Sequence, residues 1–155
     1  MSSVKLKIYT LGTSTRTMEE FLALLQGPRI KHVIDVRSFP RSKRFPHFDR
    51  KNLEYLLPRE GLAYFWLGRE LGGFRRGGYE AFCNTALFEH GLKKLLAIAS
   101  LGLSVIICAE KFPWRCHRRY IALALEKLGH EVIHILDPQQ FWSGPLLRQQ
   151  KLMPT

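Results

Sequence analysis

The sequence predicts an α/β fold, a single three-layer domain in which a mostly parallel sheet of about five strands is flanked by helices. Short apolar runs alternate along the chain with segments of helical period. The length of 155 residues is enough for one core without disulfides or metal ions. Since no repeat or break in composition divides the chain, we assign residues 1–155 to one domain, with 137–155 as a C-terminal tail.

The first half of the chain contains three predicted strands and two predicted helices. The strands are the apolar runs Lys5–Leu11, His32–Arg37 and Leu62–Leu67. A helix begins at Thr17, because Thr17 and Glu20 have the spacing of a capping box, and it ends at Gly27-Pro28. A polar loop and a second helix, with leucines at helical spacing over residues 53–57, separate the second and third strands.

The second half begins with a glycine-rich stretch that is typical of a loop close to a ligand. This stretch, Gly68–Tyr79, is either a flexible lid over the strand ends, with contact residues Glu70, Arg75, Arg76 and Tyr79, or a set of ordinary turns. The following elements are helices over Tyr79–Asn84, Leu87–Ala99 and Cys116–Leu128, and strands over Leu103–Cys108 and Glu131–Ile135. The strand ending at Cys108 is nearly all apolar, which predicts a central position in the sheet.

Positive charge is concentrated in two short segments. The chain has 24 Lys and Arg against 13 Asp and Glu, a net charge of +11. Residues 37–51 carry six basic residues and one acid, and residues 110–119 carry four and one. Each segment follows a predicted strand. We therefore expect an anionic partner, either DNA or RNA or a phosphate-bearing small molecule.

Composition excludes several classes of protein. Apolar residues make up 46% of the chain, a content that a disordered tail does not have. No apolar run approaches the roughly 20 residues that span a bilayer, and the N-terminus lacks a signal-type stretch. Three cysteines form no disulfide framework. We expect a cytoplasmic protein with free thiols and no membrane partner.

Three loops are predicted to meet where parallel strands end, at the edge where open α/β sheets bind ligands. They are Gly12–Arg16, Asp35–Arg44 and Cys108–His117. The candidate catalytic residues in these loops are Asp35, Glu110 and Cys116. The candidates for binding substrate or phosphate are Ser14, Arg37, Ser38, Arg41, Arg44, Cys108, Lys111, His117 and Arg118.

The loop after the fourth strand runs into a helix, so its amides and arginines favour an anion. A thiol at Cys116 would have its ionisation favoured there, whereas Cys108 at a strand end has the character of a buried residue. Cysteine phosphatases and sulfurtransferases share this topology, although Arg115 lies one residue further from Cys108 than in the phosphatase signature. The alternative is that both cysteines are core residues.

A metal site is a further alternative for the same loop. Cys108-Ala109-Glu110 fits the first half of a zinc deaminase pattern, but the second cysteine pair of that pattern is missing. Three ligands, Cys108, Cys116 and His117, would still leave zinc one open position. We otherwise expect no cofactor.

The loop after the second strand combines a carboxylate with cations and rings. Asp35 beside Arg37 is either a general base for water or a structural ion-pair anchor. Cations alternate with Phe39, Phe45 and Phe48 in the residues that follow. Such a surface holds phosphates and stacks bases.

Motifs across nearly the whole chain resemble one family, the domain of unknown function 488 family. They are Tyr9-Thr10-Leu11-Gly12-Thr13-Ser14-Thr15, Asp35-Val36-Arg37 with Pro40-Arg41-Ser42, Glu70-Leu71-Gly72-Gly73, Cys108-Ala109-Glu110-Lys111, Cys116-His117-Arg118 and Glu131-Val132-Ile133-His134-Ile135. The resemblance implies a single α/β domain with these loops at one site. Thr13 stands where family members usually have a histidine, so this chain lacks that imidazole.

Three functional hypotheses follow. The leading one is a nucleic-acid-binding protein, with hydrolysis such as base excision if Asp35 or Glu110 activates water. The alternative is a thiol-dependent enzyme that transfers sulfur or a phosphoryl group from a small anion through Cys108 or Cys116. The third is a non-catalytic module with a vestigial site, which the change at Thr13 permits.

Overall fold

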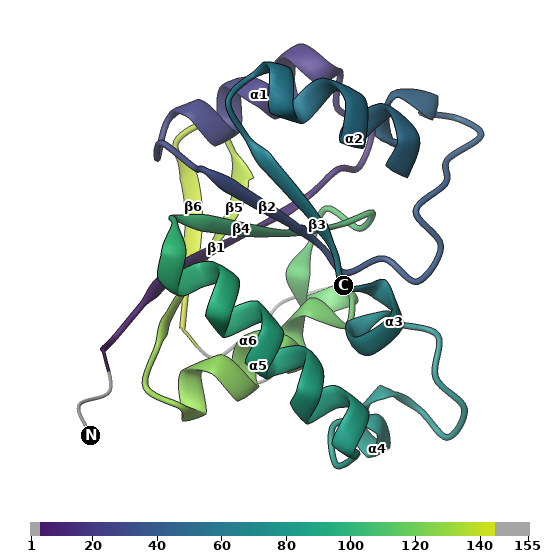
Figure 1. Cartoon of the computed structure of the whole chain (residues 1–155), viewed down its shortest axis with the longest axis vertical. Helices are drawn as coiled ribbons and strands as arrows, with labels where there is room; N and C mark the ends of the chain where they lie inside the picture. The colour runs from purple at the N-terminus through teal and green to yellow at the C-terminus, as the bar shows by residue number, and fades with distance from the viewer. Residues whose placement is uncertain (1–3, 145–155) are drawn as a thin grey trace.

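One six-stranded sheet forms the centre of the protein, in the order β3-β2-β4-β1-β5-β6 (Figure 1). The computed structural model describes residues 4–144. The strands are β1 (Lys7–Gly12), β2 (His32–Asp35), β3 (Ala63–Trp66), β4 (Ser104–Cys108), β5 (Glu131–Asp137) and β6 (Gln140–Ser143). The helices are α1 (Met18–Gln26), α2 (Arg50–Arg59), α3 (Gly68–Leu71), α4 (Tyr79–Phe82), α5 (Ala86–Leu101) and α6 (Arg118–Lys127), with 3-10 turns η1 (Pro46–Phe48) and η2 (Pro113–Arg115).

Helices cover both faces of this sheet, which confirms the predicted three-layer α/β architecture. Helices α1 and α2 lie on one face, and α5 and α6 lie on the other (Figure 1). Phe21 of α1 and Leu57 of α2 pack with Val105 of β4 in one core, while Leu95 of α5 and Ile121 of α6 belong to the other. All pairings among β1 to β5 are parallel, and only β6 runs antiparallel.

Local sequence signals place several element boundaries correctly. The predicted capping box is present, since Thr17 Oγ1 accepts from the Glu20 amide at 3.0 Å and Glu20 Oε1 accepts from the Thr17 amide at 2.7 Å. The break between the two helices near residue 85 is also confirmed, because Thr85 caps the start of α5. Strand β4 is buried along its whole length and lies between β2 and β1, as its apolar sequence predicts.

A sixth strand lies in the segment that the sequence pattern leaves as a tail. Strand β6 pairs with β5 through a register in which His134 faces Trp142 and Ile135 faces Phe141. As the edge strand, β6 has Phe141 53% exposed, so the two-residue alternation of a half-buried strand is weak there. The rest of the predicted tail, residues 145–155, lies outside the described residues.

The glycine-rich segment is packed onto the domain, so the prediction of a flexible lid is wrong for Gly68–Leu71. These residues form α3, with Leu71 fully buried. A Cβ at Gly68 would lie 2.0 Å from the Arg37 carbonyl oxygen, so this close approach requires glycine. Glu70 is buried and paired with Lys94 at 2.6 Å, and Arg75 donates to the Gly72 carbonyl at 2.8 Å. Glu70 and Arg75 therefore hold the segment in place.

Candidate anion-binding and thiol site

The carboxyl ends of β1, β2 and β4 are neighbours, and their loops enclose one cavity of about 770 Å³. Nine of the twelve predicted site residues line this cavity: Ser14, Arg37, Ser38, Arg41, Arg44, Cys108, Glu110, Cys116 and His117. Asp35, Lys111 and Arg118 are outside the lining. A volume of this size is typical of a site for a nucleotide-sized ligand.

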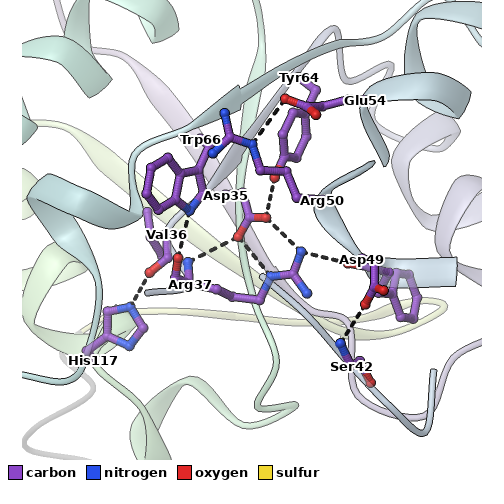
Figure 2. Close-up of polar contacts among 11 residues, drawn as sticks. Asp35, Val36, Arg37, Ser42, Asp49, Arg50, Glu54, Tyr64, Trp66 and His117 are labelled. Atoms are coloured by element: carbon purple, nitrogen blue, oxygen red, sulfur yellow. Dashed lines mark hydrogen bonds and ion pairs between the residues drawn. The ribbon is translucent and has the colours of Figure 1, made fainter. Parts of the chain in front are cut away.

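Asp35 is the centre of an ion-pair and hydrogen-bond cluster (Figure 2), and it does not line the cavity. Its carboxylate is fully buried and accepts from Arg37 Nε at 2.9 Å, from Arg37 Nη2 at 2.7 Å and from the Arg37 amide at 3.0 Å. Tyr64 donates its hydroxyl to the same carboxylate at 2.5 Å. With these donors around it, Asp35 has the geometry of the structural anchor rather than that of a base in contact with substrate.

The same cluster perturbs its neighbours. Burial raises the pKa of Tyr64, and the adjacent Asp35 charge raises it further, so the phenol stays protonated. Burial lowers the pKa of Arg37, but its hydrogen bonds and charge pairing with Asp35 outweigh this and raise it overall. Arg37 also donates to the Phe48 carbonyl at 2.8 Å. The cluster thereby fixes both ends of the basic loop between β2 and α2.

Further bonds shape the basic loop so that its cations project outward. Trp66 donates its indole N–H to the Arg37 carbonyl at 2.8 Å, and Arg50 lies over the Trp66 ring at 4.5 Å. Asp49 accepts from the Ser42 amide at 2.6 Å (Figure 2). The side chains that remain exposed at the cavity mouth are Arg41, Lys43 and Arg44. An anion entering the cavity would meet these three cations first.

Cys116 lies between η2 and α6, at the floor of the cavity. Its Sγ accepts from the Arg118 amide at 3.2 Å and from Arg118 Nε at 3.3 Å. Its Sγ also contacts Cys108 Sγ at 3.0 Å. Burial raises the pKa of Cys116, but the bond to Cys108 and the charges of Arg118 and His117 outweigh it and hold the pKa well below the ordinary thiol value. These contacts favour the thiolate form of Cys116.

Arg118 is a buried counter-ion for that thiolate. Only 1% of the residue is exposed. Its guanidinium donates to Thr10 Oγ1 at 2.9 Å, to the Glu110 carbonyl at 2.5 Å and to the Lys111 carbonyl at 3.2 Å. Burial lowers the pKa of Arg118, but the neighbouring cysteines raise it overall. Arg118 therefore acts on the cavity through Cys116, in place of the direct phosphate contact that the sequence suggests.

His117 is oriented by the backbone of the neighbouring loop. Its Nε2 donates to the Val36 carbonyl at 2.9 Å (Figure 2). A Cβ at Gly73 would lie 2.8 Å from Nδ1, so glycine is required at that position for the ring to fit. The imidazole also lowers the pKa of Cys116 beside it. A thiolate next to a histidine whose far nitrogen is fixed is the arrangement of an activated nucleophile.

The remaining candidates have distinct positions. Ser14 adopts a positive φ of 50° and donates its amide to the Ala109 carbonyl at 2.9 Å. Ser38 Oγ accepts from the Phe74 amide at 3.3 Å. Lys111 turns away to Asp137 at 3.0 Å. Glu110 lines the cavity with an exposed carboxylate.

Sequence reasoning missed several residues of the cavity wall. They are Lys43, Phe74, Arg115, Arg119 and Tyr120, whereas Tyr79 is a predicted contact residue and does line the cavity. Arg115 and Arg119 belong to the basic segment around Cys116, so charge spacing could have identified them. Tyr79 and Phe74 come from the glycine-rich segment, and only the packing of α3 brings them to this edge.

Two structural findings bear on metals and membranes. Among residues 4–144, no group of three or more histidine, cysteine or acidic side chains is arranged to hold a metal ion, and Cys108, Cys116 and His117 as a ligand set stays a prediction. Nor does this part of the chain contain a helix long and apolar enough to cross a membrane.

Comparison with known families assigns most of the chain to one family. A family model described as a domain of unknown function, DUF488, matches residues 17–125, more than half of the chain. The protein belongs to the DUF488 family. Searches of curated proteins and of solved structures find no match. The DUF488 match extends from α1 into α6 and includes Asp35, Cys108 and Cys116.

The part of the site outside the DUF488 match comes from β1, its following loop, and β5. Thr13, where members of DUF488 usually have a histidine, is 3% exposed and donates its amide to the Cys108 carbonyl at 2.7 Å. Gly12 fits against the Glu110–Lys111 loop so tightly that a Cβ would lie 2.0 Å from the Glu110 carbonyl oxygen. This loop therefore supports the thiol centre through its backbone.

Proposed function

We propose that the protein is a thiol-dependent enzyme that takes a phosphoryl group or a sulfur atom from a small anionic substrate. One observation carries this proposal: the Cys116 thiolate, held ionised by Arg118 and His117, lies at the floor of a cavity whose mouth is lined by cations. Arg118, which keeps the nucleophile ionised, is buried, whereas the cations that would attract substrate are exposed. The two groups thus perform separate tasks.

With a phosphate monoester, the Cys116 thiolate would attack phosphorus and form a thiophosphate bond. The bond from phosphorus to the ester oxygen would break, and that oxygen would leave with the electron pair and take a proton from solvent. Water would then attack phosphorus, the S–P bond would break to restore the Cys116 thiolate, and the proton of that water would pass to solvent. With thiosulfate, the thiolate would attack the outer sulfur, form a persulfide and release sulfite with the bonding pair.

The experiment is the intact mass of the protein after brief incubation with p-nitrophenyl phosphate or with thiosulfate. We expect the mass of a phosphoryl group or of one sulfur atom on the wild-type chain. Cys116→Ser should lose the adduct, and Cys83→Ser, which changes a cysteine outside the cavity, should keep it. An adduct that survives Cys116→Ser, or the absence of any adduct and turnover with both probes, would overturn the proposal.

Nucleic-acid binding is the second candidate, and one specific observation favours it. Two exposed rings, Phe39 and Phe74, lie 5.7 Å apart at the cavity mouth beside the exposed cations of the basic loop. Exposed rings next to cations are the parts that stack bases and hold phosphates. If base excision takes place, a base would enter the cavity, and Glu110 would activate water because Asp35 is enclosed by its donors.

Filter binding of a single-stranded oligonucleotide at several salt concentrations tests this second candidate. We expect the affinity to fall steeply with salt, and the slope to become shallower in a variant with Arg41, Lys43 and Arg44 changed to Ala. Phe39→Ser should weaken binding without changing the slope, since it removes stacking alone. No measurable binding, or binding that is insensitive to salt, would exclude the nucleic-acid hypothesis.

A further inference from the structure

Two sulfur atoms are in direct contact at the floor of the cavity. Cys108 ends β4 and Cys116 follows η2, and their Sγ atoms are 3.0 Å apart. A disulfide bond has a length of about 2.05 Å, so a movement of about an ångström in the two side chains would bring the atoms to bonding distance. The third cysteine, Cys83, follows α4 and does not line this cavity.

The two thiols differ in ionisation and in access. Burial raises the pKa of Cys108, and its hydrogen bond to Cys116 raises it further, which favours Cys108 as the protonated partner of the pair. Cys108 is 2% exposed, whereas Cys116 is half-buried. A reagent entering the cavity would therefore reach the thiolate first, with a protonated thiol directly behind it.

We propose that Cys108 and Cys116 form a redox pair, in which a hydroperoxide oxidises Cys116 and Cys108 then closes a reversible disulfide. In the first step the Cys116 thiolate attacks the nearer peroxide oxygen, the O–O bond breaks, and the leaving hydroxide or alkoxide takes a proton from solvent. In the second step Cys108 sulfur attacks the sulfenic acid sulfur, the S–O bond breaks, and the Cys108 proton leaves with the hydroxide as water. The peroxide is reduced by two electrons and the two thiols are oxidised.

The position of Arg118 makes this disulfide easy to reduce. In the dithiol form Arg118 donates to the Cys116 thiolate from both its amide and Nε. Disulfide formation removes that negative charge. The buried Arg118 guanidinium stays positively charged, and its remaining hydrogen-bond acceptors are all neutral. Because the charge pairing stabilises the reduced form, the equilibrium should lie further toward the dithiol than for an ordinary structural disulfide.

This inference goes beyond group transfer and does not depend on it, because disulfide formation needs only the two sulfurs and an oxidant. It does predict a consequence for the proposed enzyme, since the disulfide removes the nucleophile. Oxidised protein should form no adduct with p-nitrophenyl phosphate or thiosulfate, and dithiothreitol should restore the adduct. Failure of group transfer would leave the disulfide test intact, because that test reads the sulfurs directly.

The experiment is peptide mass analysis of the whole protein after treatment with hydrogen peroxide and alkylation of the remaining thiols. We expect one peptide pair linked between Cys108 and Cys116, an alkylated Cys83, and complete loss of the link after dithiothreitol. In Cys108→Ser, Cys116 should instead collect as sulfenic or sulfinic acid. Cys83→Ser should behave like the wild type.

Two outcomes would overturn the proposal. One is sulfinic acid at Cys116 in the wild-type protein at the same rate as in Cys108→Ser, which would show that Cys108 does not resolve the sulfenic acid. The other is that both thiols stay reduced under peroxide that oxidises free cysteine. Equilibration with glutathione buffers measures the reduction potential of the Cys108–Cys116 disulfide. Cys108→Ser should not form this disulfide in any of the buffers. A reduction potential as low as that of a structural disulfide would contradict the role given to Arg118.

Discussion

Two arginines, Arg37 and Arg118, each bind the side chain two residues before them in the sequence. Arg37 holds the carboxylate of Asp35, and Arg118 holds the thiolate of Cys116. Both arginines are buried, with 7% and 1% of their surface exposed. They differ in the access of their anions, since Asp35 lies outside the cavity lining with Tyr64 on its remaining side, whereas Cys116 faces the cavity. The same local pattern thus gives an anchor in one loop and a nucleophile in the other.

The sharpest difference concerns what happens when the arginine is removed. A carboxyl with a reference pKa of about 3.9 would need about 4 kcal/mol to be protonated at pH 7, whereas a thiol is protonated there already. We therefore expect Arg37→Met to lower the free energy of unfolding by about 3–5 kcal/mol in urea denaturation. Arg118→Met should cost clearly less, and adding Asp35→Asn to Arg37→Met should recover part of the loss. Equal losses of unfolding free energy in Arg37→Met and Arg118→Met would show that the two buried pairs do not differ in this way.

The second largest expected effect is the loss of Cys116 reactivity in Arg118→Met. The pKa of Cys116 would rise to or above its ordinary value, and the rate of alkylation by iodoacetamide at pH 7 should fall about 100-fold. In the wild type the lowered pKa keeps the thiolate populated as pH falls below 9.0, and reactivity should decline only when pH passes through that lowered pKa. Burial and the nearby Glu80 raise the pKa of Cys83. Cys83 should therefore react slowly at pH 7, and its alkylation rate gives a reference within the same protein.

A matched control for this variant is Arg115→Met, which removes an exposed cation of the same cavity. Its alkylation rate should stay within a few-fold of the wild type, because Arg115 makes no bond to Cys116 among the contacts of the described residues. If Arg115→Met slows alkylation as much as Arg118→Met, general cavity charge and not the buried pair sets the reactivity.

The comparison also shows what the sequence could predict. The hydrophobic period predicts where the strands end, and local hydrogen bonding predicts the capping box at Thr17. The parallel topology of the sheet predicts that the three loops meet. For Asp35 the sequence leaves a general base and a structural anchor both open, and for Arg118 it suggests a phosphate contact. Only tertiary packing shows that both side chains are enclosed. The membership in DUF488, suggested by the motifs, is confirmed by the family match.

Other features depended on contacts between distant segments. The approach of α3 to the Arg37 carbonyl is possible only at Gly68, and glycines alone do not distinguish a mobile loop from close packing. The contact between Cys108 and Cys116 arises because the 3-10 turn η2 brings the chain back to the end of β4. Hydrophobic periodicity does not predict a chain reversal such as the one at η2.

Thr10→Val tests the support behind the thiol centre. Thr10 Oγ1 accepts from Arg118 at 2.9 Å and is hydrogen-bonded to His134 Nδ1 at 2.6 Å. Burial and then the Arg118 charge lower the pKa of His134 to about 3 and keep the ring neutral. Valine would leave both groups without this partner, so we expect a loss of about 2 kcal/mol in urea denaturation and a few-fold slower alkylation of Cys116. Thr10→Ser should restore both. Unchanged alkylation would mean that Thr10 does not position Arg118.

Tyr64→Phe has the smallest expected effect and tests whether the anchor is separate from the nucleophile. The variant removes one of the bonds to Asp35 and leaves those from Arg37, so we expect a loss of about 1 kcal/mol, measured in urea. Tyr55→Phe, on a side chain that is 62% exposed, should be neutral. Because the Tyr64 hydroxyl makes no contact with Cys116, alkylation should not change. A large drop in the rate would show that the anchor and the thiol centre are energetically coupled through the Val36–Arg37 backbone that His117 binds.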